Sequence, residues 1–318
     1  MKSWSNMTSD QKKFLETYTN ENFIGHVSNL KIGEELVPIE PNKEYPFMCS
    51  DCPGPKSAWR YENQTVENYY DPELTYKLNN FTFRSDDFSK EKANNNMLYS
   101  GCSFTFGVGV PYKSIWANIL NNSLGYKDFY SLAICGGSFE SIIFDIYTYI
   151  KKFGAPKGIV VLFPPPIRVM SYSEEENAIR MIPFRVVHMN DVEEKRFFKD
   201  NRDLLSYDLW TVKFYHMITA LELYLESIGV KFLWGCWDIY VNKVFEKISG
   251  LKNFVNIDGG PADKFRLAVE LNHIDYSSYV NKYWINARDT HPSAKEHFVF
   301  YKIFESEWIK RYGQGTSN

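Results

Sequence analysis

The chain has 318 residues and a net formal charge of −3, with 44% hydrophobic and 24% charged residues. This composition is typical of a globular protein with a sizeable core and excludes a chain that is disordered throughout. Because acidic and basic residues nearly balance, nothing indicates a dedicated nucleic-acid binder or a protein that charge holds on an anionic membrane. The first ten residues lack the apolar segment of a secretory signal peptide, and no apolar run is long enough to span a bilayer.

Residues 1–75 differ in character from the rest of the chain. Five prolines lie between residues 38 and 55, and no long periodic segment occurs after Phe23. We expect a loop-rich extension or small subdomain that attaches the chain to an assembly partner. Cys49 and Cys52 form a CxxC pair, but no second pair or nearby histidine completes a zinc site, so we expect neither a metal nor another cofactor.

From residue 76 onward, short apolar runs alternate with stretches of helical periodicity. The runs are rich in β-forming residues and are bounded by glycine, proline or polar residues. We expect strands at residues 97–100, 129–134, 158–163, 230–234 and 254–257. Strand–helix alternation of this kind predicts an α/β fold in which helices cover both faces of a parallel sheet.

Apolar residues at helical spacing predict the helices between these strands. They lie at about residues 115–120, 139–153, 214–228 and 293–308. Ser138 is placed to cap the second helix and Gly154 to end it. Ser293 and Glu296 have the spacing of a capping box at the start of the last helix. Residues 171–210 do not fit the alternation, and with a charged run at 174–176 and a candidate strand at 184–189 they predict an insertion near the site.

Ligands bind beyond the carboxyl ends of the strands in such sheets, so the residues just after each strand are the candidates for a site. Ser103 lies after the first strand, two residues beyond Gly101, where a nucleophile can be exposed with its own N–H available to an oxyanion. A polar turn explains the same residues. Gly136 lies after the second strand, where N–H groups at a helix start attract an anion. A connection that needs a positive φ explains this glycine equally well.

His291 lies near the C-terminus, two residues after Asp289 and just before the last helix. The helix N-terminus should lower the pKa of the imidazole and the carboxylate should raise it, and the balance can leave a neutral base near pH 7. An exposed histidine in a loop is the alternative. The other histidines, at positions 26, 188, 216, 273 and 297, are expected to be structural.

Taken together, these segments resemble the SGNH (GDSL-type) hydrolases. The match to the first block, GDSxTxG, is fairly specific, whereas the other matches are short and persuade by their order. The matching segments are 101–110 (GCSFTFGVGV) with Trp116 for the first block, 131–136 for the second, 289–292 (DTHP) for the fifth, and 76–84 (YKLNNFTFR) for the segment that precedes the first block. The resemblance covers residues 76–318. It implies a flavodoxin-like three-layer α/β/α sandwich and a serine esterase or acyl hydrolase that uses no metal.

The resemblance also implies a role for each matching residue. Ser103 is the nucleophile and lends its N–H to the oxyanion hole, with Gly136 as the second donor. His291 is the base that takes the Ser103 proton, and Asp289 orients it. The implied substrate is an ester. Abundant Trp and Tyr side chains that can stack on sugar rings make an O-acetylated carbohydrate the candidate.

The chain departs from the family pattern at four points, and divergence of this kind is typical of phage-encoded members. Cys102 stands where the family has Asp, Ser131 stands where it has Asn, and Asp289 is one residue closer to the histidine. Prolines 164–166 replace the third-block segment that supplies an Asn donor. Loss of one oxyanion donor costs about 2.7–4 kcal/mol of barrier. Arg168 is a candidate replacement donor.

Other functions stay open. A hydrolase scaffold with impaired catalysis would serve as a structural or binding component, for example of a viral particle, with residues 1–75 on the assembly partner. Nucleotide or flavin binding would need a phosphate-cradling glycine loop or a P-loop lysine, which GCSFTFG lacks. Cys102 is a less favoured nucleophile than Ser103. We expect a cytoplasmic or virion-associated protein that binds neither nucleic acid nor a membrane.

Overall fold

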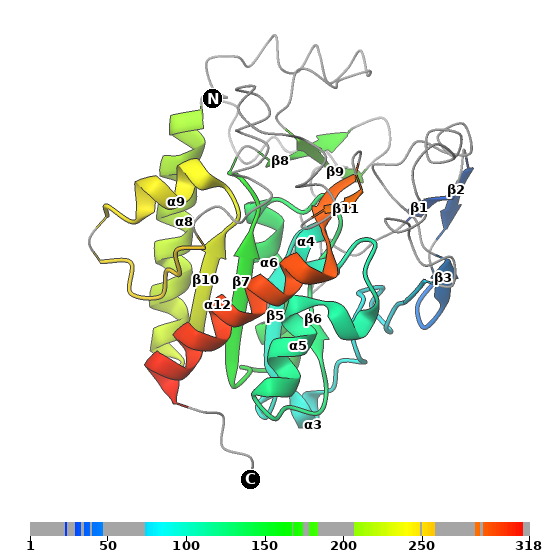
Figure 1. The fold of residues 1–318 in the computed structure, drawn as a ribbon, viewed down its shortest axis with the longest axis horizontal. Coiled ribbons are helices and arrows are strands. Elements are labelled where there is room, and N and C mark those ends of the chain that lie inside the picture. Colours follow the sequence, from blue (N-terminus) through cyan, green and yellow to red (C-terminus); the bar gives the residue numbers. More distant parts are fainter. Residues whose placement is uncertain are drawn as a thin grey trace, which may run out of the picture.

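Figure 1 shows the fold of the chain in a computed structural model. The residues whose structure it describes are 23, 29–32, 35–38, 40–46, 74–166, 168–173, 178–183, 207–248, 250–257, 284–286 and 289–313. Some features singled out in the sequence lie outside the described residues: Cys49 and Cys52, the charged run at 174–176, the candidate strand at 184–189, and the histidines at 26, 188 and 273.

Strands and helices alternate along the chain from residue 97 onward. The described strands are β1 (Asn29–Ile32), β2 (Glu35–Pro38), β3 (Glu44–Pro46), β4 (Thr75–Lys77), β5 (Met97–Gly101), β6 (Tyr130–Ser131), β7 (Gly158–Phe163), β8 (Arg168–Ser173), β9 (Ala178–Pro183), β10 (Lys231–Cys236), β11 (Trp284–Asn286) and β12 (Asp289–Pro292). The described helices are α3 (Lys90–Ala93), α4 (Ser103–Phe106), α5 (Trp116–Ser123), α6 (Phe139–Phe153), α8 (Tyr207–Ser227), α9 (Ile239–Phe245) and α12 (Ala294–Tyr312), with a 3₁₀ turn at Tyr112–Ser114.

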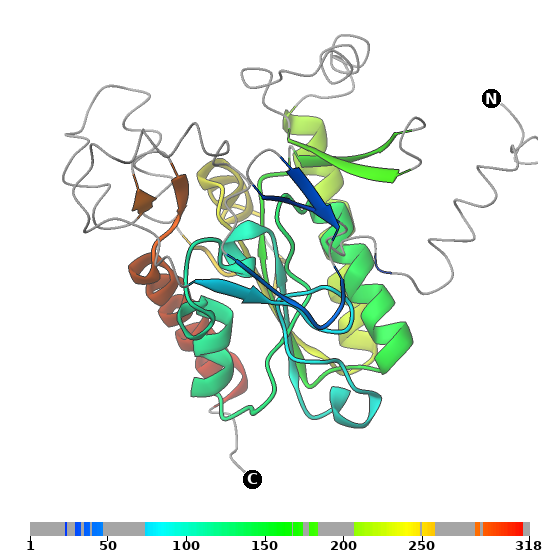
Figure 2. The same ribbon diagram turned by 90° about the vertical axis from the view of Figure 1, so that its right-hand side faces the viewer.

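In the described part of the chain, four strands form one sheet in the order β10-β7-β5-β6, and all three pairings are parallel. Read from the β6 edge, the strands run second, first, third and fourth in chain order across the sheet, which is the flavodoxin-like order. Figures 1 and 2 show α5 and α12 on one face of this sheet and α6 and α8 on the other. The predicted α/β/α sandwich with a parallel sheet is therefore confirmed.

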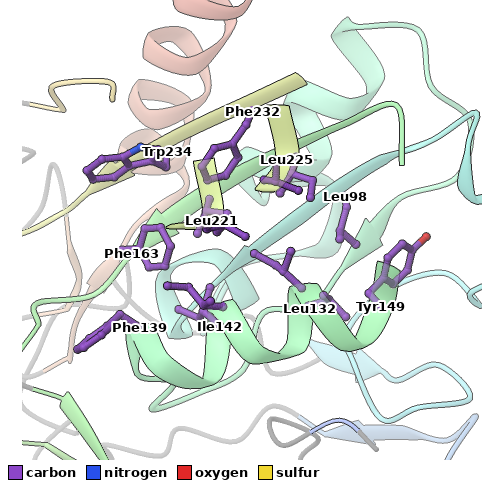
Figure 3. Close-up of a cluster of buried hydrophobic side chains, with 14 of the residues drawn as sticks. Leu98, Leu132, Phe139, Ile142, Tyr149, Phe163, Leu221, Leu225, Phe232 and Trp234 are labelled. Carbon is purple, nitrogen blue, oxygen red and sulfur yellow. The ribbon is translucent and has the colours of Figure 1, made fainter. Parts of the chain in front are cut away.

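The central strands read as continuous apolar runs because both of their faces are buried. Every residue of β7 is buried, and its side chains alternate between the two helical layers. Phe163, together with Phe232 and Trp234 of β10, packs under α6 and α8, where Ile142 and Leu221 complete one half of the core (Figure 3). The opposite side chains of the same strands pack against α5 and α12. Two hydrophobic layers therefore fix the sheet from both sides.

Short antiparallel pairs surround the sandwich. They are β1 with β2, β3 with β4, β8 with β9, and β11 with β12. The pair of β3 and β4 joins residues on either side of the undescribed stretch 47–73, and Tyr45 and Tyr76 pack in a cluster with Phe106 behind α4. The division between an extension at 1–75 and a hydrolase-like domain at 76–318 stays a prediction.

Some predicted elements differ from the observed ones. The strand expected at 129–134 is short because, after β6, the chain bonds to β5 at isolated points, such as the Ile134 N–H to the Gly101 oxygen at 3.2 Å. The strand expected at 254–257 is a single bridge between Phe254 and Trp234. Helix α8 begins at Tyr207 and not near residue 214, so it takes in the end of the predicted insertion, and β8 and β9 form a hairpin that the pattern did not reveal.

The helix termini test the predicted caps. Ser138 caps α6 through a reciprocal capping box with Ser141, and Gly154 is the C-cap, as expected. At α12 the predicted capping box is wrong: Ser293 is the N-cap but makes no capping hydrogen bond through its side chain. Glu296 is fully buried.

Two absences hold for the described ranges alone. No helix there combines the length and the apolar character needed to cross a membrane. No cluster of three or more His, Cys, Asp or Glu side chains there is arranged to hold a metal ion.

His297 on α12 has the structural role that the sequence predicted for it. Its ring is fully buried, and Nδ1 accepts a hydrogen bond from the Trp116 N–H at 3.2 Å, which joins α12 to the start of α5. Burial lowers the pKa of the His297 imidazole from 6.5 to about 3, and electrostatic interactions with Arg84 and His291 act in the same direction. The native ring is therefore neutral at physiological pH.

We expect His297 to make the protein less stable in mild acid. In the unfolded chain the ring binds a proton below about pH 6.5, whereas in the folded chain it does so only below about 3. The free energy of unfolding should fall by about 1.4 kcal/mol for each pH unit below 6.5. In His297→Gln, the amide oxygen can still accept from the Trp116 N–H, but the side chain does not bind a proton in this pH range. Urea unfolding at pH 7.5 and pH 5.5 should therefore show a loss of unfolding free energy about 1.4 kcal/mol smaller in this variant than in the wild type. An unchanged pH dependence in this variant would contradict the assignment.

Candidate active site

The Ser103 turn lies at the carboxyl end of β5, where a parallel sheet binds ligands. Gly101 ends the strand, and a Cβ atom there would lie 2.1 Å from the Thr105 Oγ1 and 2.7 Å from the Leu162 oxygen of β7. Only glycine therefore allows β5 to turn this closely against β7. Ser103 is the first residue of α4, so its N–H has no acceptor within the helix, and the residue is 4% exposed.

A buried arginine fixes the far end of the same turn. The guanidinium of Arg84 donates to the main-chain oxygens of Phe106, Gly107 and Val110, at 3.1, 2.6 and 3.0 Å. Its carbon lies 4.3 Å from the centre of the Tyr76 ring, and the Tyr76 hydroxyl accepts from the Gly109 N–H at 2.9 Å. Burial lowers the pKa of Arg84 to about 10, so the group stays charged at neutral pH.

The second predicted turn, at Gly136, is attached to the first. The Ile134 N–H donates to the Gly101 oxygen at 3.2 Å, and Gly137 packs close to the same oxygen. Gly136 itself is exposed, with φ of +76°, and its N–H makes no hydrogen bond to the main chain within the described ranges. Ser131, which stands at the second-block Asn position, is buried, and its hydroxyl accepts from the Ala133 N–H at 3.3 Å. The Ser131 side chain therefore stays within its own turn.

His291 lies in β12, beside the helix that begins with Ser103. Its ring centre is 5.9 Å from that of Phe104 in an edge-to-face arrangement, and the residue is 4% exposed. The alternative of an exposed loop histidine is therefore wrong. Asp289 pairs with Asn286 in the same small sheet, and the side chain of Asp289 is outside the described part of the structure.

The aromatic pair Phe104 and Trp237 links the ends of the central strands, and sequence reasoning missed Trp237. The two rings stack at 4.5 Å, and the Trp237 indole N–H donates to Sγ of Cys102 at 3.3 Å. The guanidinium carbon of Arg168 lies 5.6 Å from the centre of the same indole. A tryptophan directly after the β10 run was the available signal, because residues just beyond a parallel strand lie at the edge where ligands bind.

His216, the remaining histidine with a described side chain, lies exposed on α8, beside a cavity of about 430 Å³ that Leu209, Trp210 and Met217 help to line. The structure therefore brings Ser103, the Gly136 turn and His291 to the same edge of the sheet, with Arg168 beside Trp237 at the end of β7. His216 and His297 have no part in this arrangement.

The chain was compared with models of protein families, with curated proteins and with solved structures. No model of a known protein family matches the chain, and no curated protein matches it either. The chain is similar to the crystal structure of a member of the lipolytic protein G-D-S-L family from Veillonella parvula DSM 2008, with 12% identity and a TM-score of 0.33, covering 68% of this chain and 97% of that one. It is also similar to a G-D-S-L family protein described as lipolytic from Desulfitobacterium hafniense DCB-2, with 12% identity and a TM-score of 0.35, covering 67% of this chain and 99% of that one.

We expect Arg84→Lys to destabilise the protein by about 2–4 kcal/mol. A lysine ammonium cannot reach three carbonyl oxygens in the planar fork of a guanidinium, so buried acceptors lose their donors. Urea unfolding measured by circular dichroism gives the loss. Arg311→Lys is the matched control: Arg311 also donates to main-chain oxygens, those of Lys252 and Phe254, but near the surface where water can replace it. Equal losses in the two variants would contradict the role given to Arg84.

Proposed function

We propose that the chain is a carboxylic ester hydrolase in which Ser103 is the nucleophile and His291 the general base. One observation carries this proposal: the His291 ring packs against Phe104, the residue directly after Ser103, although 187 positions separate Phe104 and His291 in the chain. A nucleophile and a base at one edge of a parallel sheet are the parts that acyl transfer requires.

In the proposed reaction, His291 takes the proton of Ser103 as its oxygen attacks the carbonyl carbon of the ester. The tetrahedral intermediate then collapses, and His291 returns the proton to the departing alcohol. Water, activated by the same imidazole, hydrolyses the acyl-enzyme and regenerates Ser103. Asp289 is proposed to orient His291. If Asp289 does not reach the ring, a Ser–His dyad performs the same steps with less stabilisation of the imidazolium.

The N–H groups of Ser103 and Gly136 are the proposed donors to the oxyanion. The first opens α4 and the second lies in an exposed turn, so both are available to a ligand. Main-chain donors that are held before the reaction need no reorganisation as charge develops. Arg168 was the third candidate. Its position over the Trp237 indole suits contact with the body of the substrate better than contact with the carbonyl beside Ser103.

The proposed substrate is an acetyl ester of a carbohydrate. Because Ser103 is only 4% exposed, a small acyl group can approach its oxygen more easily than a long chain can. The abundance of Trp and Tyr in the chain, whose side chains can stack on sugar rings, makes a carbohydrate the candidate for the alcohol portion.

A second candidate function is a scaffold without catalysis, serving as a structural or binding component, for example of a virus particle. The observation that favours it is the end of β7, where the buried residues Pro164, Pro165 and Pro166 offer neither an amide side chain nor an N–H to an oxyanion. In that case, residues 1–75 would bind the assembly partner.

Labelling with a fluorophosphonate separates the two functions. We expect one covalent adduct on Ser103, detected by mass spectrometry of the intact and digested protein, and complete loss of the adduct in Ser103→Ala. Ser100→Ala is the matched control: it removes a serine hydroxyl from the same strand-to-helix segment, at a residue that is fully buried and therefore inaccessible to the probe. Absence of labelling in the folded wild-type protein would favour the scaffold.

We expect His291→Gln to slow labelling and ester cleavage about 10²–10⁴-fold, because a positioned general base typically contributes that much. Continuous assays with 4-nitrophenyl acetate measure the rate. His216→Gln, which changes an exposed histidine on α8, should leave the rate within about twofold, since surface changes rarely propagate to a distant site. Equal rates for wild type and His291→Gln would remove His291 from the mechanism.

A further inference from the structure

Arg168 occupies a stiff and well-defined place at the end of the central strand β7. Three prolines precede it with one intervening residue, and its main-chain N–H donates to the Pro165 oxygen at 3.3 Å. Each proline fixes its φ angle near −65°, so the segment has few conformations available. Arg168 therefore lies beyond the carboxyl end of β7, after three prolines whose φ angles are fixed.

The guanidinium of Arg168 has an unused hydrogen-bonding capacity. Its Nη1 is buried, and within the described ranges it has no hydrogen-bond acceptor. The residue as a whole is partly exposed, and its charged group lies over the face of Trp237, at 5.6 Å. An arginine in a protein keeps its charge, and a buried donor without an acceptor costs about 1–3 kcal/mol. The protein tolerates this cost at a place where a ligand can supply the acceptor.

Trp237 ties this cation to the nucleophile turn. The main-chain N–H of Trp237 donates to the Phe163 oxygen at the end of β7, and the indole N–H donates to the sulfur of Cys102, the residue before Ser103. The indole also stacks on Phe104, the residue after Ser103. The Trp237 indole that lies beneath Arg168 therefore contacts both the residue before Ser103 and the residue after it. Arg168 lies at the same edge of the sheet.

We infer that Arg168 and Trp237 form a subsite for a carboxylate of the substrate, carried on its alcohol portion. The inference rests on the proposed function and deepens it: the favoured substrates are acetyl esters of acidic compounds, such as sugar acids. The guanidinium fork matches a carboxylate through two parallel N–H bonds, and the indole face holds the fork in one plane. We place the carboxylate on the alcohol portion of the ester and not on its acyl group, because the nearly buried Ser103 favours a small acyl group.

The test compares 3-acetoxybenzoate with its methyl ester, which differ by one negative charge on the alcohol side. We expect the wild-type protein to prefer the anionic ester at least about tenfold in kcat/KM, a size typical of one charge-assisted pair. Arg168→Gln should raise KM for the anionic ester about tenfold and leave kcat/KM for the methyl ester within about twofold. Arg168→Lys should retain part of the preference. Lys252→Gln, at a side chain that is 75% exposed, controls for the loss of one positive charge.

Two outcomes would overturn the inference. Equal use of both esters by the wild type would show that no carboxylate subsite exists. A fall in kcat for the methyl ester in Arg168→Gln would make Arg168 an oxyanion donor instead.

If no ester is cleaved at all, the proposed function fails, and a binding measurement then tests the carboxylate subsite independently of catalysis. Ligand-observed NMR should show that 3-hydroxybenzoate binds to Ser103→Ala and its methyl ester does not, and that Arg168→Gln abolishes this binding; binding without charge preference would end the inference.

Discussion

One buried cation holds the turn on which the candidate site depends. The guanidinium of Arg84 supplies hydrogen bonds to three carbonyls of the chain that leaves α4, and the Tyr76 ring covers it. Because the group is charged and inside the protein, any shift of that loop would leave buried donors and acceptors unpaired. The opposite end of the turn is equally constrained, since no side chain fits at Gly101. The position of Ser103 is therefore a consequence of packing on both sides of it.

Phe104 is the residue at which distant parts of the chain meet. Its ring contacts Trp237 from the end of β10 and His291 from β12, while its main chain continues directly from Ser103. An aromatic ring suits this task because it offers two faces and an edge, and each accepts a different partner geometry. Phe104 thus links the segment that contains Ser103 to the strand that contains His291 through ring contact.

The proline segment after β7 shows how one change can remove one kind of chemistry and create another. In the family that the motifs resemble, a neutral amide would lie there and donate to a transient oxyanion. Prolines 164–166 supply no such donor, but they carry Arg168 to the indole of Trp237. A guanidinium can pair through two N–H groups with a carboxylate that the substrate carries from the start, and this is the partner inferred above for Arg168.

The sequence by itself determined the central strands and the helices that flank them, because strand and helix periods and the capping role of Ser138 are local properties. It also indicated His291, through a short motif. Tertiary structure alone decided three things: that His291 is buried beside Phe104, that Trp237 contacts the Ser103 turn, and that Arg84 holds the same turn in place. These depend on contacts between segments more than twenty positions apart, and no local pattern records which distant side chain fills a given space. The start of α8 and the β8–β9 hairpin were missed for the same reason, since neighbouring segments and not intrinsic propensity set them.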